Sequence, residues 1–254
     1  RFLSIFFIVA IGCAFFSGIR ASEPDMRYSG DEYFDNKNMM DIQVISTMGL
    51  SEEDLSAIKA VDGIEYAEGG YSSDVLCTDG ANQVVVHVMS MLPTMNQVQL
   101  EDGRLPEAED ECALDVDYLA ESNLEIGDTV TFSSGTEDDI ADTLVTDTFT
   151  ITGAVSSPNY ISFQRGSATI GNGSVSAFAY VPEEAFSLDV YTEICARVEG
   201  EAELTAFTDK YDDRVAEVLE NVEAIKEERQ EARYEEVVEE AETALNDAEQ
   251  EVAD

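Results

Sequence analysis

Basic residues are scarce in this chain, which has 13 Lys and Arg against 55 Asp and Glu and a formal net charge of −42. Nucleic acids and anionic lipid surfaces bind proteins mainly through Lys and Arg side chains. We therefore expect no nucleic acid among the partners of this protein. Such an acidic surface favours solubility and contacts with cationic ligands or basic proteins, although a merely solvated exterior is the simpler interpretation.

Histidine is nearly absent, since His87 is the only one. A Ser-His-Asp or Cys-His catalytic site would have to use it, and a histidine zinc site needs further nitrogen or thiolate donors. His87 lies between valines in the strand-like segment QVVVHVMSM. We interpret it as a histidine of a sheet. The sequence therefore predicts no catalytic residue, and the protein is not expected to be an enzyme.

Nucleotide-binding and metal-binding motifs are missing as well. Gly171-Asn172-Gly173 lacks the spacing and the Lys of a phosphate-binding loop and indicates a turn. Asp138, Asp139 and Asp142 offer oxygen ligands to calcium, but they lack the calcium-loop pattern, so a solvated loop is favoured. We predict no cofactor-binding residue, no metal-binding residue and no cofactor.

Cysteine is also sparse, with four residues and no Cys-x-x-Cys pair. Cys13 lies in an apolar run, whereas Cys77, Cys112 and Cys195 are scattered without metal-ligand spacing. One disulfide among these three remains open in an oxidising compartment. Buried, inert thiols are the favoured interpretation.

The chain has one long hydrophobic run, which extends over residues 2–19 without a charged side chain between Arg1 and Arg20. Eighteen helical residues span roughly 27 Å, close to the hydrocarbon thickness of a bilayer. We favour a transmembrane helix over residues 1–21, continued by a polar stalk over residues 22–39. A secretory signal peptide and a lipoprotein signal ending at Cys13 are the alternatives; the apolar residues after Cys13 weigh against the second.

Residues 40–200 form the expected globular part. The chain as a whole is 44% hydrophobic, which is enough for a packed core. In residues 40–200, short apolar runs alternate with turn residues. Ser51 and Asp115 are suited to cap short helices, and Asp79-Gly80 and Asp102-Gly103 indicate turns. The segments expected as strands are residues 41–46, an extended segment starting at Ile64, and residues 71–77, 83–91, 112–114, 129–132, 144–155, 176–181 and 190–198, the last closing the sheet. This pattern predicts an α+β domain.

The last segment, residues 201–254, changes character because it contains neither Gly nor Pro. Residues 199–254 include 21 acidic and 5 basic residues, so they hold −16 of the net charge. Apolar residues recur at spacings of three and four, which predicts one long helix with a coiled-coil stripe interrupted at Arg229. We expect this helix to pack on a partner helix, either further along the chain or on another chain.

Several motifs follow one another in a recognisable order. They are Gly63-Ile64-Glu65, LEDGRLP over residues 100–106, ECALD over 111–115, LEIGDTVTF over 124–132 and FTITGAV over 149–155. Behind an N-terminal membrane helix, this order resembles the extracytoplasmic domain of FtsX/MacB-type ABC transporter permeases over about residues 1–200. Residues 160–186 also resemble a clostridial-type branch of large permeases, some of which carry a coiled-coil insertion.

The resemblance implies a MacB-like periplasmic core in the extracytoplasmic part of a bacterial permease located in the cell membrane. A separate cytoplasmic ABC ATPase subunit would hydrolyse ATP, and membrane helices would transmit the motion to this domain. The implied partners are that ATPase, the membrane and an extracytoplasmic protein or peptide, in a dimeric permease. The alternative is a single-pass, membrane-anchored adhesion or scaffold protein that uses the coiled coil as a spacer.

Overall fold

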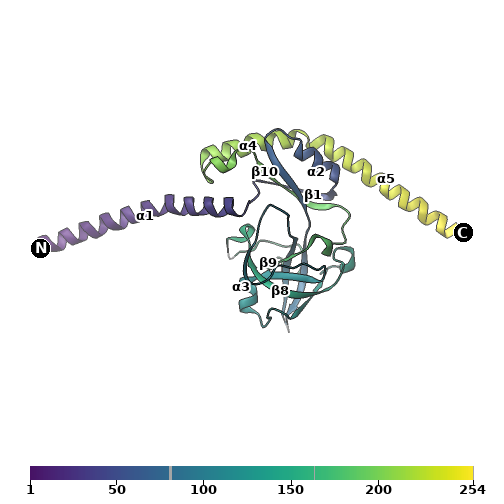
Figure 1. The fold of residues 1–254 in the computed structure, drawn as a ribbon, viewed down its shortest axis with the longest axis horizontal. Coiled ribbons are helices and arrows are strands. Elements are labelled where there is room, and N and C mark those ends of the chain that lie inside the picture. Colours follow the sequence, from purple (N-terminus) through teal and green to yellow (C-terminus); the bar gives the residue numbers. More distant parts are fainter. Residues whose placement is uncertain (80–81, 163, 254) are drawn as a thin grey trace.

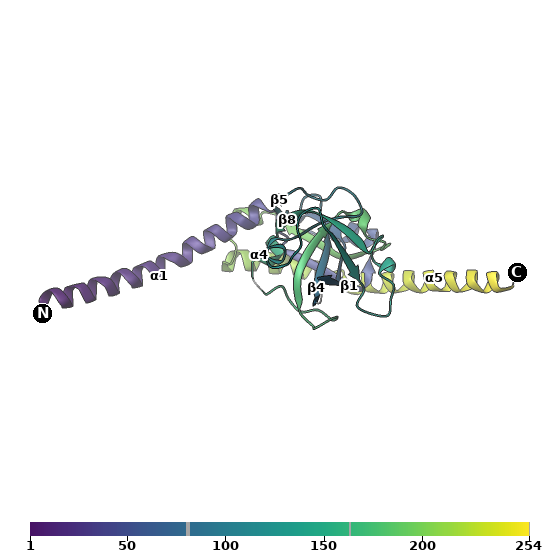
Figure 2. The ribbon, with the colours of Figure 1, turned by 90° about the horizontal axis from the view of Figure 1, so that it is seen from below.

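The computed structural model describes residues 1–79, 82–162 and 164–253. Two sheets and a set of short helices form the centre, and one long helix leaves the centre at each end of the chain (Figure 1). The α+β class predicted from the sequence is confirmed. Figure 2 shows the same arrangement from below, with the N-terminus and the C-terminus at opposite ends of the molecule.

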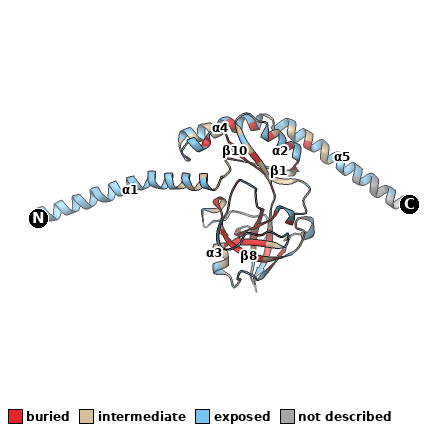
Figure 3. Cartoon of the chain, viewed as in Figure 1, coloured by how far each residue is buried: buried red, intermediate tan, exposed pale blue. Residues whose placement is uncertain are grey.

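The N-terminal helix α1 (Phe2–Asn36) is continuous over 35 residues and has Pro24 inside it. It is long and apolar enough to cross a membrane, and it is the one such helix in the described parts of the chain. None of its residues is buried (Figure 3). The prediction that the apolar helix continues into the polar segment is confirmed up to Asn36.

The larger sheet has seven strands in the order β5-β8-β6-β9-β4-β3-β7. It curls round so that β7 also pairs with β8, and Phe132, Phe149 and Ile151 fill the enclosed core. β4, which holds QVVVHVMS, lies between β3 and β9 as its two apolar faces predict. The strands are β3 (Ser72–Asp79), β4 (Asn82–Ser90), β5 (Gln99–Gly103), β6 (Glu111–Asp115), β7 (Thr129–Ser133), β8 (Thr148–Ser156) and β9 (Val175–Val181).

A second, three-stranded sheet is formed by β1 (Ile42–Leu50), β10 (Tyr191–Val198) and β2 (Ile64–Gly70), with β10 in the middle. The prediction that residues 190–198 close a single sheet is therefore wrong. Ile194, Ala196 and Val198 of β10 pack under the helices α2 (Glu52–Lys59) and α4 (Asp209–Ala224). β10 is thereby the central strand of a second small core.

The helix caps that the sequence predicts are present. The Ser51 hydroxyl accepts a hydrogen bond from the Asp54 amide, and the Asp54 carboxylate accepts one from the Ser51 amide, which makes a capping box at the start of α2. Asp115 caps α3 (Val116–Glu121) by accepting a hydrogen bond from the Asp117 amide. One-turn 3₁₀ helices occur at η1 (Ile140–Asp142), η2 (Pro158–Tyr160), η3 (Glu183–Ala185) and η4 (Glu201–Glu203).

The predicted turn at Asp102-Gly103 is not present, because both residues belong to β5. Gly103 has φ +76° at the end of that strand, and a Cβ there would lie 2.3 Å from the Thr152 carbonyl oxygen. Glycine is thus required for strand pairing instead of a turn. The other predicted turn, Asp79-Gly80, includes Gly80, which lies outside the described residues.

The C-terminal segment is two helices, α4 and α5 (Lys226–Ala253), joined by a bend at Ile225. Val218 and Val222 of α4 are buried in the small core. The structure thus has two helices where one long helix was predicted, and they separate four residues before the predicted interruption at Arg229. The first half of the apolar stripe is covered by this chain's own sheet. The second half projects away from the domain (Figure 1).

Candidate functional site

The C-terminal end of α1 is bound by a loop between β4 and β5, residues 91–98, which we call the docking loop. The Asn96 amide donates to the Asn38 carbonyl (3.0 Å), and the Gln97 amide donates to the Lys37 carbonyl (2.8 Å). In return the Met40 amide donates to Asn96 Oδ1 (3.0 Å). The docking loop thus both donates hydrogen bonds to residues 37–40, which follow α1, and accepts one from them.

Two asparagines give this contact its backbone shape. Asn38 has φ +47° and Asn96 has φ +51°, so both occupy the left-handed region that Asn tolerates better than most residues. The docking loop is held from its other side by Glu68 of β2, whose carboxylate accepts from the Met95 amide (3.0 Å). The loop therefore connects α1 to the small sheet.

Arg197 of β10 is a second connection between α1 and the domain. Its guanidinium donates to Asn38 Oδ1 (2.9 Å) and to Asp35 of α1 (3.4 Å), and it forms an ion pair with Glu201 of η4. Only 7% of the Arg197 side chain is exposed. A largely buried charge needs such partners, which makes this cluster sensitive to the position of α1.

The segment after η4 completes the junction with α1. The Ala206 amide donates to Asp31 Oδ1 (2.6 Å), and Arg27 donates to the Phe207 carbonyl. The rings of Phe34 and Phe207 lie 5.8 Å apart. Three turns of α1 therefore contact residues that are about 180 positions away in the sequence.

Carboxylates at the junction have altered proton affinities. Burial, together with the negative charge of Asp41, raises the pKa of Glu201 to about 7, and the attraction of Arg197 opposes this only in part. Burial also raises the pKa of Asp41, although Asp41 accepts hydrogen bonds from the Val198 amide and the Tyr211 hydroxyl. The junction thus contains acids that are protonated more readily than surface carboxylates.

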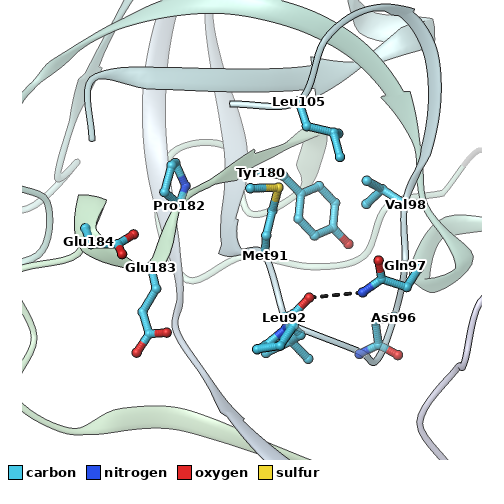
Figure 4. Close-up of a pocket in the computed structure, with 11 residues that line it drawn as sticks. Met91, Leu92, Asn96, Gln97, Val98, Leu105, Tyr180, Pro182, Glu183 and Glu184 are labelled. Atoms are coloured by element: carbon cyan, nitrogen blue, oxygen red, sulfur yellow. Dashed lines mark hydrogen bonds between the residues drawn. The ribbon is translucent and has the colours of Figure 1, made fainter. Parts of the chain in front are cut away.

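A cleft of about 380 Å³ opens beside the docking loop (Figure 4). Met91, Val98, Leu105 and Tyr180 give it an apolar lining, and the two acids Glu183 and Glu184 stand on one side. The Gln97 side chain donates to the Leu92 carbonyl (3.0 Å), so the loop wall of the cleft is braced internally. The same loop therefore forms a wall of the cleft and the attachment of α1.

A second cavity of about 300 Å³ lies around Arg165. Its guanidinium is bonded to Asp115 (2.9 and 3.0 Å) and Asp117 (2.7 Å) and to two carbonyls, those of Tyr160 and Ser162. All five N–H donors are used, which leaves none for a ligand. We interpret Arg165 as the residue that holds the long loop after β8 against α3.

The structure places His87 on the sheet surface, half-buried on β4. Its Nδ1 lies 2.6 Å from Asp74 Oδ1 on the neighbouring strand β3, and Tyr160 packs edge-on at 6.5 Å. The interpretation as a histidine of a sheet is confirmed. Cys77, Cys112 and Cys195 are buried, and burial raises the pKa of the Cys112 and Cys195 thiols.

The other residues considered from the sequence have local roles. Asp139 caps η1, and Asp138 accepts a hydrogen bond from the Thr136 hydroxyl, so both serve their own loop. Gly171 and Gly173 have φ values of +58° and +81°, which confirms the turn. In the part of the chain that the structure describes, no three His, Cys, Asp or Glu side chains are grouped to hold a metal ion.

The junction residues Asn96, Arg197 and Glu201 are absent from the sequence interpretation. Arg197 carries one usable signal, because it interrupts the apolar end of a strand and precedes an acid by four positions. Its remaining partners are about 160 residues away, and no local pattern reports them. Asn96 carries no signal that separates it from an ordinary turn residue.

No protein-family model and no curated protein matches this chain. Among solved structures, it is similar to the extracellular domain of the ABC-type transporter YknZ from Gram-positive bacteria, with 12% identity over 70% of this chain and 87% of that one and a TM-score of 0.39. It is also similar to the periplasmic region of MacB from Actinobacillus actinomycetemcomitans, with 14% identity over 74% and 84% of the two chains and a TM-score of 0.38.

Proposed function

We propose that this chain is the extracytoplasmic portion of an ABC transporter permease subunit, which couples cytoplasmic ATP hydrolysis to export, extraction or regulation of an extracytoplasmic partner. The observation that carries the proposal is the unbroken helix α1, which runs from an apolar, membrane-length segment directly into the junction with the domain. The order of the sequence motifs, which resembles FtsX/MacB-type permeases, supports the same function.

The junction is suited to transmit a displacement. Backbone hydrogen bonds hold a helix together as one body, so a shift or tilt of its membrane end also moves residues near Asn36. The docking loop and Arg197 are bonded to that end, and the loop is also a wall of the cleft. A movement of α1 therefore changes the shape of the cleft, where an extracytoplasmic partner is expected to bind.

The experiment measures that movement in the full-length protein assembled with its ATPase in lipid nanodiscs. Spin labels at Pro93→Cys of the docking loop and at Glu184→Cys on the facing side, in a Cys13→Ser background, report the distance across the cleft, since both positions line it and are exposed. We expect ATP with vanadate to change this distance. The proposal would be contradicted if no ATPase subunit associates with the protein, or if the distance between the labels is the same with and without nucleotide.

A junction variant separates coupling from assembly. Asn96→Gly keeps the left-handed backbone but removes the side chain that bonds the Met40 amide and approaches Cys195. We expect ATP hydrolysis to persist while the nucleotide-dependent change in distance falls by more than half. Asn172→Gly makes the same change in an exposed turn whose hydrogen bonds, among the described residues, stay within residues 168–174, so it is the control and should behave as wild type.

A second candidate function, a single-pass anchored adhesion or scaffold protein, is favoured by the projecting helix α5 (Figure 1). A spacer helix of this kind extends the reach of an anchored domain without any input from ATP. The same labels decide between the two functions, because a scaffold shows one distance in every nucleotide state.

A further inference from the structure

The outer half of α5, residues 234–253, is a helix with little support from the rest of the molecule. Its attachment comes just before it: Arg229 pairs with Asp54 of α2 (2.8 Å), and the buried Arg233 donates to the Met48 carbonyl at the end of β1 (3.3 and 3.4 Å). From there the helix extends away from the domain (Figures 2 and 3). The attachment fixes which face of the outer half is presented.

An apolar stripe follows the outer half. Tyr234, Val238, Ala241 and Leu245 recur at steps of four, three and four, so they lie on one face. Tyr234 and Leu245 are each 61% exposed and Val238 is 37% exposed. Side chains of this size at coiled-coil spacing are the contact positions of a helix that packs on another helix.

The charge on the outer half determines the kind of helix that fits. Residues 234–253 contain eight acidic residues and no Lys or Arg. Glu235 and Glu239 are like charges four positions apart, which repel one another along the helix. Glu236 and Glu240 both pair with Arg233 (3.1 and 3.6 Å), so that one cation already faces two acids. Negative charge in the C-terminal half also opposes the helix dipole. A partner that stabilises this helix must therefore bring positive charge.

Two other candidate occupants of the stripe would bring negative charge instead of positive charge. A second copy of α5 would set eight acidic residues against eight more, and an anionic lipid surface would likewise repel them. A helix with Lys or Arg beside an apolar stripe satisfies both the stripe and the charge, in the manner of oppositely charged coiled-coil flanks.

We propose that the outer half of α5 is the docking surface for a basic amphipathic helix of a partner protein. The apolar face of that helix packs on Tyr234, Val238 and Leu245, and its Lys and Arg side chains lie against the flanking glutamates. The inference concerns a surface separate from the junction and the cleft, so it stands or fails independently of the proposed transporter function.

The test uses the full-length protein in nanodiscs of zwitterionic lipid and a fluorescent 21-residue peptide of Leu/Lys heptads, with empty nanodiscs subtracted. We expect saturable binding by anisotropy, and a loss of at least tenfold in affinity for the double variant Val238→Asn/Leu245→Asn, which keeps every charge. Ile45→Asn, an exposed apolar residue on β1, is the matched control and should bind as wild type.

A charge variant guards against simple unfolding of the helix. Glu235→Gln/Glu239→Gln relieves the repulsion between these two exposed residues and leaves the ion pairs of Arg233 with Glu236 and Glu240 intact. It should nevertheless weaken peptide binding and the dependence of that binding on salt. Binding that is unaffected by Val238→Asn/Leu245→Asn would overturn the proposal, since charge alone would then explain it. Complete conversion of a Leu245→Cys variant into disulfide-linked homodimers would also overturn the proposal, because a second copy of the chain would then occupy the stripe.

Discussion

Arg165 shows how a single side chain can position a long loop in this protein. It is 8% exposed, its partner Asp115 is 1% exposed, and the aromatic ring of Phe178 lies 5.3 Å from the guanidinium carbon. Asp115 also caps α3, so one carboxylate joins the loop to the helix. A buried pair of this kind contributes little net energy while intact, but the loss of one partner leaves an uncompensated charge.

We expect Arg165→Met to destabilise the domain by about 3–5 kcal/mol, measured as a lower midpoint in urea unfolding, because it leaves the buried Asp115 carboxylate without its cation. Burial already raises the pKa of Asp115, and removal of Arg165 raises it further. An acid whose pKa is raised on folding favours the folded state at low pH and loses that contribution as pH rises. The deficit should therefore be larger at pH 7 than at pH 5.

The control for this prediction is Glu217→Ala, which removes the partner of Arg214 in an exposed pair at 3.2 Å. It should change the unfolding free energy by less than about 1 kcal/mol. Equal effects of the two variants would show that the Arg165 pair is not buried as described.

At the same residue scale, the sequence predicted the features that depend on near neighbours. The caps at Ser51 and Asp115 need only an acceptor and an amide two or three positions away, so their pattern is local. Arg197 and Asn96 were missed because their partners belong to α1, which is distant in the sequence. Asp102-Gly103 was misassigned because glycine serves equally in a turn and in a crowded strand end.

At the scale of elements, most strands were found, with β5 the exception, but their grouping was not. The periodicity of residues 190–198 indicates a strand, yet nothing in it says which strands are its neighbours, and β10 lies between β1 and β2 instead of closing the larger sheet. The C-terminal stripe shows the same limit. Its spacing predicts a helix that packs, but Val218 and Val222 pack on this chain's own sheet.

The junction of α1, β10 and η4 should respond to pH through Glu201. Its pKa is raised from 4.5 to about 7, so the group stabilises the folded junction fully below pH 4.5 and loses this contribution as pH rises through 7. We expect the Tm to fall between pH 5.5 and pH 8. Glu201→Gln, which resembles the protonated acid, should reduce that fall and raise the Tm at pH 8.

The whole-protein charge also makes acid conditions favourable, so a neighbouring variant is needed for comparison. Glu203→Gln changes an exposed carboxylate of the same 3₁₀ turn and removes the same formal charge. It should leave the pH dependence of the Tm close to that of wild type. Identical behaviour of the two variants would assign the effect to net charge and not to the buried junction.

At the scale of the whole molecule, α1 and α5 extend from opposite sides of the two sheets (Figure 1). Cys13 is the exposed cysteine of the four and lies within the apolar segment of α1, while the other three are buried in the sheets. If α1 spans the bilayer, lipid covers Cys13, and none of these four thiols faces water in the folded protein. The distribution of cysteines thus offers a direct test of topology.

We expect Cys13, Cys77, Cys112 and Cys195 of the full-length protein to resist a membrane-impermeant maleimide in intact cells, as peptide mapping would show. Glu203→Cys or Glu239→Cys variants should react at the introduced position, since both positions are exposed on the domain and on α5. Detergent and urea together should then make the native thiols reactive. Intact-mass analysis should find α1 retained and Cys13 unmodified. Labelling of the introduced cysteines only after the membrane is opened would place the domain in the cytoplasm. Loss of residues 1–20 would show that α1 contains a cleaved signal peptide. An acyl chain on Cys13 would show that the protein has a lipid anchor.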